Sequence, residues 1–297
     1  MPREVATLVM FPGQGAIGPG AGRTWTTSPH WQLVDRISAL TEMDVAHLLL
    51  HAGEEEIIRT DNAQTATFAL SLMSYYAYLE QFPEPDYFVG HSLGEFSALV
   101  AAGVLSLEDG SRIVAARGRA MSEAASLEPG TMAALMGGSG GDISQVLTID
   151  GIWLGNVNGP DQLVISGRVA ALEILADNLL EYGWKKCRML RVGGAFHSPL
   201  MAPATESLRE ALQQAEFRDT SKTIFANVDG QPYHGGDVWQ TLALRQLTSP
   251  VQFLACIESA SSLVHQAVEM QPAGVLKGLV KRIAPTIELS SVEGGSR

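Results

Sequence analysis

The chain has 297 residues, of which 46% are hydrophobic and 18% are charged, and its formal net charge is −12. This composition is typical of a globular enzyme and excludes a disordered protein. The acidic balance disfavours nucleic-acid binding, and no apolar run has the length of a membrane span. The N-terminus lacks the layout of a signal peptide, which predicts a cytoplasmic location. Two distant cysteines, Cys187 and Cys256, favour buried thiols over a disulfide framework or a metal site.

Strand-like and helix-like segments alternate along the chain, which predicts an α/β architecture. The first predicted strand, residues 7–11, runs into a glycine-rich loop, and a long apolar helix covers residues 64–79. A buried strand at 86–89 is followed by helices at 95–104 and 105–125. Later segments include a helix at 201–215 and a strand at 223–227, which continue the same alternation.

The composition changes near residue 127, where glycines separate short segments in the order β-α-β-β-α-β. The predicted elements are strand 131–136, helix 143–148, strands 152–156 and 162–166, helix 169–182 and strand 186–192. This order is typical of a ferredoxin-like fold. We therefore predict a small ferredoxin-like subdomain at residues 127–194, inserted into a large α/β subdomain formed by residues 1–126 and 195–297.

The most informative motif is Gly90-His91-Ser92-Leu93-Gly94, which lies between a predicted strand and a predicted helix. In this context Gly-x-Ser-x-Gly is a nucleophile elbow, a tight turn that exposes the serine Oγ above the sheet. Glycine is needed on both sides because a Cβ atom there would collide with the neighbouring strand and helix. The motif predicts Ser92 as the nucleophile of a covalent mechanism.

A serine hydroxyl needs a base within hydrogen-bonding distance, and the chain offers seven histidines. His91 is adjacent to Ser92 and would point away from it on the elbow. His197 lies in the loop Gly193-Gly194-Ala195-Phe196-His197-Ser198-Pro199, which leaves a predicted strand. Because flanking glycines and a proline suit a positioned side chain, we predict His197 as the general base.

Acyl transfer also needs hydrogen-bond donors for the developing oxyanion. The backbone amide of Leu93 is the usual first donor, and the loop Gly13-Gln14-Gly15 is placed to supply a second from Gln14. The glycine spacing of this loop matches neither the dinucleotide-binding motif nor the Walker motif, so we discard the interpretation as a phosphate-binding loop for a nucleotide. Arg117, on the helix after the elbow helix, carries a planar fork that suits bidentate binding of a carboxylate.

Together these residues resemble the malonyl-CoA:acyl carrier protein transacylases and the acyltransferase domains of polyketide synthases. The similarity follows the family's motif order over almost the whole chain, and this collinearity is more specific than any single motif. The matching stretches are Phe11-Pro12-Gly13-Gln14-Gly15, Gly90-His91-Ser92-Leu93-Gly94-Glu95, Arg117-Gly118-Arg119-Ala120-Met121, Asn156-Val157-Asn158-Gly159-Pro160, Ala195-Phe196-His197-Ser198, Ser249-Pro250-Val251-Gln252-Phe253 and Val275-Leu276-Lys277-Gly278-Leu279.

The resemblance implies an α/β-hydrolase-like large subdomain and a ping-pong mechanism without a cofactor or a metal. Ser92, activated by His197, would take a malonyl group from malonyl-CoA and pass it to the phosphopantetheine thiol of an acyl carrier protein. Arg117 would pair with the malonyl carboxylate, and the backbone carbonyl of Gln252 would orient the His197 ring. Phe196, before the histidine, would crowd a C2 methyl group and so favour malonyl over methylmalonyl units.

The sequence departs from the family pattern in two places. Ala16-Ile17 stands where the family usually has Ser-Gln, and Gln271-Pro272-Ala273-Gly274 replaces the usual Gly-Pro-Gly region. An acyl-carrier-protein hydrolase with the same Ser–His machinery is the alternative function, although such relatives tend to lack the arginine. A non-catalytic scaffold would predict loss of Ser92 or His197. Fatty acid and polyketide pathways both fit the sequence.

A basic cluster lies within seven residues of this acidic chain, at Lys185, Lys186, Arg188 and Arg191. Clusters of this kind are usually solvated faces. Because carrier proteins are strongly acidic, the alternative interpretation is a docking patch for the acyl carrier protein. The family resemblance implies a monomer.

Overall fold

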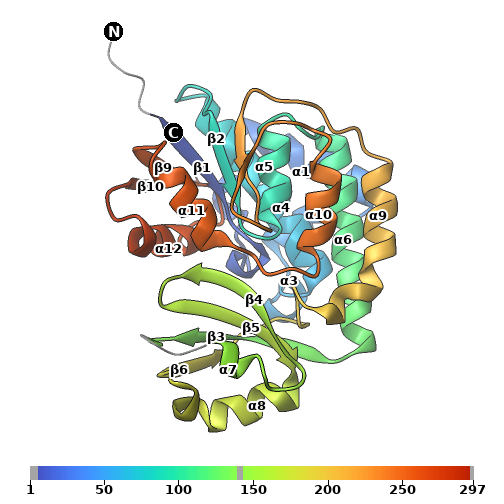
Figure 1. Cartoon of the computed structure of the whole chain (residues 1–297). Helices are drawn as coiled ribbons and strands as arrows, with labels where there is room; N and C mark the ends of the chain where they lie inside the picture. The colour runs from blue at the N-terminus through green and yellow to red at the C-terminus, as the bar shows by residue number, and fades with distance from the viewer. Residues whose placement is uncertain (1–5, 139–142, 295–297) are drawn as a thin grey trace.

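A computed structural model describes residues 6–138 and 143–294, so residues 139–142 of the predicted small subdomain lie outside the described ranges. The large subdomain contains a six-stranded sheet in the order β10-β9-β1-β2-β7-β8 (Figure 1). All neighbours are parallel except β7 and β8, which are antiparallel. The strands are β1 (Thr7–Phe11), β2 (Tyr87–Gly90), β7 (Thr223–Phe225), β8 (Pro232–Tyr233), β9 (Gln266–Glu269) and β10 (Glu288–Ser291).

Helices cover both faces of this sheet, and the side chains of β1 show how. Val9 and Phe11 belong to the core shared with the helices on one face, whereas Leu8 and Met10 pack with α11 and α12 on the other. Because successive strand residues point to opposite faces, a strand buried on both sides is apolar throughout. The helices are α1 (Gln32–Thr41), α2 (Val45–Leu50), α3 (Glu54–Ile57), α4 (Thr60–Leu79), α5 (Gly94–Ala101), α6 (Leu107–Leu127), α9 (Thr205–Gln213), α10 (Trp239–Gln246), α11 (Phe253–Ser261) and α12 (Val275–Ile283).

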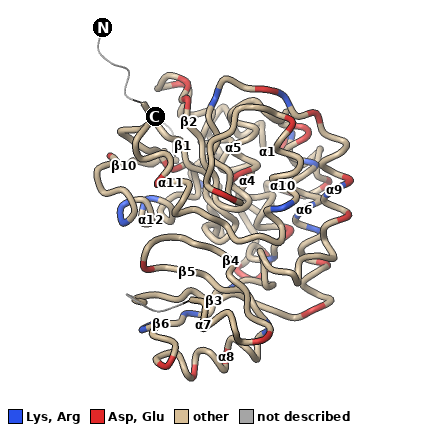
Figure 2. Tube along the Cα trace, in the orientation of Figure 1, with Lys and Arg blue, Asp and Glu red and all other residues tan. Residues whose placement is uncertain are grey.

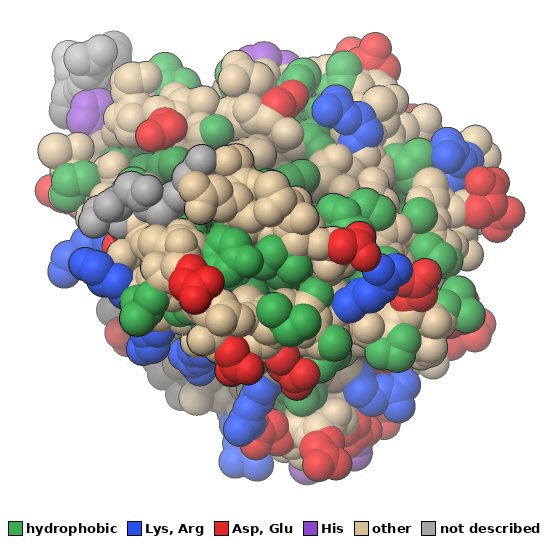
Figure 3. Space-filling model, turned by 60° about the horizontal axis from the view of Figure 1, so that its bottom comes forward, with side chains coloured by type: hydrophobic (Ala, Val, Ile, Leu, Met, Phe, Trp, Pro, Cys, Tyr) green, Lys and Arg blue, Asp and Glu red, His purple; other side chains and the backbone are tan. Residues whose placement is uncertain are grey.

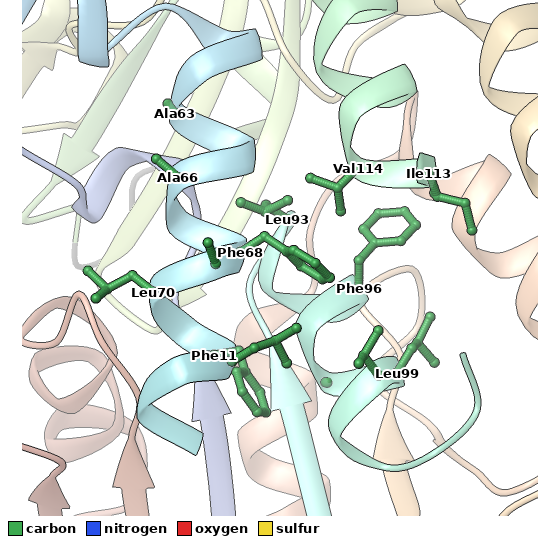
Figure 4. Packing of buried hydrophobic residues seen from close by; sticks show 14 of the residues in the cluster. Phe11, Ala63, Ala66, Phe68, Leu70, Leu93, Phe96, Leu99, Ile113 and Val114 are labelled. Atoms are coloured by element: carbon green, nitrogen blue, oxygen red, sulfur yellow. The ribbon is translucent and has the colours of Figure 1, made fainter. Parts of the chain in front are cut away.

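The helix α4 lies at the centre of the large subdomain and is buried around most of its circumference. Figure 4 shows Phe68 of α4 and Phe96 of α5 close together in the space between these helices and α6. The helix α6 begins at Leu107, two residues after the predicted start, because the side chain of Ser106 caps it by accepting a hydrogen bond from the Asp109 amide at 3.0 Å. These helices form a rigid support for the turn that carries Ser92.

The small subdomain has an antiparallel sheet in the order β4-β5-β3-β6, which confirms the ferredoxin-like prediction. One face of the sheet packs on its own helices through a core that includes Ala133, Leu135 and Ile165. The other face, with Met132 and Val164, joins the core of the large subdomain. Its elements are β3 (Gly130–Met136), α7 (Ile143–Val146), β4 (Ile152–Gly159), β5 (Gln162–Arg168), α8 (Val169–Asp177) and β6 (Lys186–Met189).

The strand β4 fastens the small subdomain to the large one. The amide of Val157 donates to the Val251 carbonyl at 2.8 Å, and the Val251 amide donates to the Gly155 carbonyl at 2.9 Å. The strand β4 ends at Gly159, three residues beyond the predicted end at Asn156, because its pairing with β5 continues to that residue. The contact with Val251 fixes the position of β4 relative to the elbow.

Two predicted helices are divided in the structure. Residues 169–182 form α8 and a separate 3₁₀ turn at Leu179–Tyr182. The segment 201–215 begins as a 3₁₀ helix at Pro199–Ala204 and becomes α9 only at Thr205, because Pro203 cannot donate an α-helical hydrogen bond. None of the helices in the described ranges is long and apolar enough to cross a membrane.

Candidate active site

The pentapeptide around Ser92 forms a tight turn between β2 and α5. Ser92 has a φ of 52°, a conformation that is rare for residues other than glycine. A Cβ atom on Gly90 would lie 2.0 Å from the Glu95 nitrogen, and one on Gly94 would lie 2.0 Å from the Phe11 carbonyl oxygen. Both glycines are therefore dictated by close backbone packing, as expected for a nucleophile elbow.

The structure brings Ser92 and His197 together, although they are 105 residues apart in the chain. The distance between Ser92 Oγ and His197 Nε2 is 2.8 Å, and the histidine is 4% exposed. His197 also has a positive φ, 59°, in the loop that leads from the small subdomain back to the large one. This geometry allows the imidazole to take the serine proton directly.

The residue that orients the His197 ring differs from the prediction. His197 Nδ1 lies 2.8 Å from the carbonyl oxygen of Gln246, not of Gln252. The Gln252 carbonyl instead accepts a hydrogen bond from the Cys256 amide at 3.0 Å in the first turn of α11. Gln246 is the last residue of α10, and carbonyls at a helix C-terminus have no partner within the helix. The prediction for Gln252 is therefore wrong.

Arg117 is completely buried behind the serine. Its Nη1 donates to Gln64 Oε1 at 2.5 Å, and its Nη2 donates to Gln246 Oε1 at 3.0 Å and to Ser92 Oγ at 3.2 Å. Its Nε is buried and has no hydrogen-bond partner among the described residues. The guanidinium group therefore reaches the nucleophile directly and keeps unused hydrogen-bonding capacity beside it.

A buried network of polar side chains, which sequence reasoning missed, surrounds the elbow. Gln246 Nε2 donates to the Ser92 carbonyl at 3.0 Å and to Glu95 Oε2 at 2.6 Å. Glu95 Oε1 accepts from the Asn227 amide at 2.7 Å, and Asn227 Oδ1 accepts from the Ser92 amide at 2.7 Å. One residue, Glu95, could have revealed this network from the sequence. It is a carboxylate in a mostly apolar helix, and a carboxylate that is buried requires hydrogen-bonding partners.

The pKa values of three buried groups are shifted at this site. Burial, helped by the positive charge of Arg117, lowers the pKa of His197 to about 3. Burial raises the pKa of Glu95 to about 7, against the opposing effects of its hydrogen bonds and Arg117. Burial also lowers the pKa of Arg117 to about 10, and Glu95 opposes that shift. At neutral pH His197 is therefore neutral and able to accept a proton.

The loop that contains Gln14 packs directly on the elbow. A Cβ atom on Gly13 would lie 3.0 Å from the His91 carbonyl oxygen. The Gln14 side chain is held by Thr60, with Nε2 to Oγ1 at 2.7 Å. Within the described ranges, the backbone amides of Gln14 and Leu93 donate to no other backbone group. Two free N–H groups beside Ser92 match the requirements of an oxyanion hole.

A cavity of about 560 Å³ opens in front of Ser92 and His197. The small subdomain contributes apolar wall residues from β3 and β5, among them Met132 and Val164, and Phe196 lies in the wall next to the histidine. Ile17 also lines the cavity, so the departure from the family pattern at Ala16-Ile17 faces the substrate space. Arg117 lies next to this cavity through its hydrogen bond to Ser92 Oγ at 3.2 Å.

Two residues of the basic cluster line the cavity, and the other two lie outside it. Arg188 and Arg191 line the cavity, whereas Lys185 and Lys186 are exposed beside it. Arg191 forms an ion pair with Glu54 of α3. Figure 2 shows the basic residues of β6 and α12 on the same side of the view, while blue and red side chains intermingle on the outer face of the small subdomain in Figure 3.

Neither cysteine belongs to the site: Cys187 is half-buried in β6 and Cys256 is buried under the large sheet. In the part of the chain that the structure describes, no group of three or more His, Cys, Asp or Glu side chains is arranged to hold a metal ion. The chemistry available at the cavity is that of the serine, the histidine and the hydrogen-bond donors around them.

A Ser–His pair on a nucleophile elbow in an α/β fold defines a class of proteins built for acyl chemistry. This chain belongs to the acyl transferase domain family, whose model matches residues 10–285. A malonyl CoA-acyl carrier protein transacylase of Bacillus subtilis is 37% identical over 290 residues, which cover 92% of this chain and 89% of that protein.

Solved structures give the same result. An acyl-carrier-protein S-malonyltransferase from Bartonella henselae has a TM-score of 0.90 at 30% identity, covering 98% of this chain and 96% of its own. A malonyl-transacylase in complex with its holo type II polyketide synthase acyl-carrier protein also has a TM-score of 0.90 at 30% identity, with the same coverage. These likenesses confirm the predicted fold class and family.

Proposed function

We propose that this chain transfers a malonyl group from malonyl-CoA to the phosphopantetheine thiol of an acyl carrier protein through an acyl-enzyme on Ser92. One observation carries this proposal. Ser92 Oγ lies 2.8 Å from His197 Nε2 and 3.2 Å from Arg117 Nη2. A base and a carboxylate-binding cation thus meet at one nucleophile, which suits an acyl group that ends in a carboxylate.

In the first half-reaction, His197 Nε2 takes the Ser92 proton while Oγ attacks the malonyl thioester carbon. The amides of Gln14 and Leu93 stabilise the negative charge on the carbonyl oxygen. The C–S bond then breaks, and His197 returns its proton to the departing CoA thiolate. The Gln246 carbonyl holds Nδ1 protonated, which leaves Nε2 free to act as the base.

In the second half-reaction, His197 takes a proton from the carrier's thiol, whose sulfur attacks the ester carbon of malonyl-Ser92. The C–O bond breaks, and His197 returns the proton to Ser92 Oγ. The same oxyanion donors serve both half-reactions because the tetrahedral centre forms at the same place. General-base catalysis by His197 activates a thiol or a water molecule alike for attack on the acyl-serine, so the choice of acceptor depends on binding.

Arg117 has a second effect through its charge. In the free protein, burial and the positive charge of Arg117 both lower the pKa of His197. A malonyl carboxylate next to Arg117 would neutralise much of that charge and so raise the pKa of His197. The substrate carboxylate thereby makes the base stronger at the moment when it is needed. A simple acyl chain without a carboxylate would lack this effect.

Phe196 supports malonyl as the acyl group. Its side chain is 4% exposed in the cavity wall, and its carbonyl accepts a hydrogen bond from Ser166 Oγ. Because this hydrogen bond holds the Phe196 backbone against β5, Phe196 cannot easily move away from a methyl group at C2 of the acyl group. A steric preference of this kind is worth about 1–3 kcal/mol, so methylmalonyl would react more slowly without being excluded.

The partner in the second half-reaction would be an acidic carrier protein docked at the basic cluster. Lys185, Lys186, Arg188 and Arg191 lie at or beside the cavity through which the phosphopantetheine arm must enter. Arg191 is already paired with Glu54, so the lysines and Arg188 supply most of the free positive charge. Acidic partners are attracted to such a surface in a salt-dependent manner.

Intact-protein mass spectrometry tests the proposal, first with malonyl-CoA and then with a holo carrier protein. We expect a malonyl adduct that Ser92→Ala abolishes, that Arg117→Ala strongly reduces, and that moves to the carrier faster than it hydrolyses. No adduct from malonyl-CoA would contradict the proposal. An adduct lost only to water would favour the alternative, an editing hydrolase with the same Ser–His pair.

A further inference from the structure

Glu95 is a buried titratable group that the proposed mechanism does not use. Its side chain on α5 is fully buried, and so is that of Arg117 on α6. The side-chain amide of Gln246 joins the two. Its Nε2 donates to Glu95 Oε2 at 2.6 Å, and its Oε1 accepts from Arg117 Nη2 at 3.0 Å. The free protein thus holds one buried cation and one buried carboxyl group that are linked through a single amide.

Titratable groups from several elements act on Glu95. Burial raises the pKa of Glu95 to about 7, Arg117 opposes this shift, and Asp229, in the segment after β7, adds to it. Cys256 on α11 stays a neutral thiol, because burial, Glu95 and Asp229 raise its pKa well above the ordinary value. His197 is neutral as well, because burial and Arg117 lower its pKa to about 3. Glu95 is therefore the member of this cluster whose charge changes most readily near neutral pH.

Malonylation of Ser92 brings a second carboxylate to this cluster. Ser92 Oγ, which would carry the acyl group, lies 3.2 Å from Arg117 Nη2. A malonyl carboxylate that pairs with Arg117 therefore shares this cation with Glu95. Two negative charges beside one positive charge are unfavourable in a buried site, where repulsion is weakly screened, so one of the two carboxyl groups gains a proton.

We propose that Glu95 takes up a proton from solvent when Ser92 is malonylated and releases it when the malonyl group leaves. The malonyl carboxylate stays charged because it contacts Arg117 directly, whereas Glu95 is one amide away. The buried cluster is then neutral before and after loading. Because it needs the malonyl carboxylate at Arg117, this inference rests on the proposed function.

The amide of Gln246 allows this change of charge. In the free protein its nitrogen faces Glu95 and its oxygen faces Arg117, as a carboxylate and a cation require. Once Arg117 turns to the malonyl carboxylate, the amide can reverse, so that its oxygen accepts a hydrogen bond from the Glu95 hydroxyl. The reversal costs the bond from Nε2 to the Ser92 carbonyl.

Proton uptake is measured in the first half-reaction with a pH indicator in weakly buffered solution, and intact-protein mass spectrometry counts the adduct. The Ser92 hydroxyl is replaced by the CoA thiol, so the chemistry itself neither takes up nor releases a proton while the thiol stays protonated. If the second carboxylate raises the pKa of Glu95 to about 8, uptake should reach about half a proton per malonyl group near pH 7.5. It should approach zero near pH 5.5, where Glu95 is already protonated.

A second measurement needs no substitution. A protein that binds a proton on malonylation is malonylated more completely at lower pH, because the two equilibria are linked. At a fixed ratio of malonyl-CoA to CoA, the ratio of malonylated to free protein should therefore fall about 5-fold from pH 6 to pH 8. The same ratio for acetyl-CoA, whose acyl group has no carboxylate, should stay constant.

Glu95→Gln should abolish both the proton uptake and the pH dependence of malonylation, because it removes the carboxyl group. Glu210→Gln on exposed α9 is the matched control and should keep both. Infrared difference spectra of the wild-type protein, made with isotope-labelled glutamate, identify the acceptor even if Glu95→Gln does not fold. Protonation of a glutamate removes a labelled carboxylate band, whereas protonation of His197 leaves it unchanged.

The outcomes separate this inference from the proposed function. A wild-type protein that is malonylated without proton uptake, at a ratio independent of pH, would show that Glu95 keeps its charge. Uptake that persists in Glu95→Gln, or that leaves the labelled carboxylate bands unchanged, would assign the proton to another group and overturn the inference. If malonyl-CoA forms no adduct at any pH, the proposed function fails instead.

Discussion

The two subdomains use polar side chains in opposite ways. Beneath the elbow, Arg117, Glu95 and Gln246 are buried and bonded to one another or to the backbone of Ser92. On the wall formed by the small subdomain, Asn156 Oδ1 has no partner, and Arg188 forms no ion pair with any described residue. Partnered buried groups hold a geometry, whereas unpartnered groups at a cavity are available to a ligand. The large subdomain thus supplies the catalytic pair and Arg117, the proposed partner of the substrate carboxylate, and the small one supplies much of the cavity wall.

The largest effect should come from a methyl group at the elbow. In Gly94→Ala, the new Cβ would lie 2.0 Å from the Phe11 carbonyl oxygen, and backbone atoms cannot move away cheaply. We expect the free energy of unfolding to fall by more than about 3 kcal/mol, or folding to fail, in urea titrations. Gly278→Ala on α12 is the control, because no atom lies within 4 Å of its Cβ. An equal decrease in the free energy of unfolding in both variants would contradict the close packing at the elbow.

The buried network should be the next most sensitive feature. Gln246→Leu removes the side-chain bonds to Arg117, Glu95 and the Ser92 carbonyl but keeps the backbone carbonyl that orients His197. We expect kcat/KM for malonyl transfer to fall roughly 10- to 100-fold, because Arg117 loses a partner and Glu95 is left buried with fewer donors.

Gln240→Leu on the same helix is the matched substitution, since Gln240 bonds only to the Leu212 carbonyl, away from the cavity. A similar loss in both variants would show that the effect comes from α10 as a whole. A fall in kcat/KM confined to Gln246→Leu would show that the bonded polar side chains under the elbow support the chemistry.

The pH dependence of Ser92 reactivity tests the electrostatics of the large subdomain. Since burial and Arg117 lower the pKa of His197 to about 3, the base stays neutral on acidification through pH 6.5 and is protonated only near pH 3. The rate at which a neutral serine-directed sulfonyl fluoride labels Ser92 should therefore not fall on acidification near pH 6.5. In other words, the pH profile should have no acid limb there. In Arg117→Gln the limb should move to higher pH, because one cause of the low pKa is removed.

This experiment avoids titration of the substrate carboxylate because the reagent has none. Circular dichroism at each pH separates protonation of His197 from acid unfolding. A wild-type acid limb near 6.5 that persists in Glu95→Gln, which removes the carboxyl group with a pKa of about 7, would contradict the low pKa of the buried histidine.

The smallest effect should come from the surface of the small subdomain. Reversing the charges at Lys185 and Lys186 should raise the KM for the carrier protein about 3-fold at low salt, and less at high salt, because exposed charges are screened. Steady-state kinetics at two ionic strengths measure this, with Arg209→Glu on α9 as a charge-reversal control. An unchanged KM would leave the basic cluster as an ordinary solvated face.

Many of the elements and their order could be predicted from the sequence. Alternation of apolar strands and helices predicted the large sheet, and β1 was found at the predicted residues, Thr7–Phe11. The order of short segments after residue 127 predicted the ferredoxin-like insertion, and the structure has that order. The elbow glycines were also readable locally, since their close contacts involve residues next to them or the strand beside them.

Which distant groups meet could not be predicted from the sequence, because it depends on how the elements pack. His197 lies 105 residues from Ser92, and the carbonyl that faces its ring belongs to Gln246, because α10 ends there and leaves that carbonyl free. Local sequence cannot show which of several carbonyls in a segment points at a ring. In the same way, strand register alone placed Asn156 and Arg188 in one row, because a shift of one residue would turn either side chain to the opposite face.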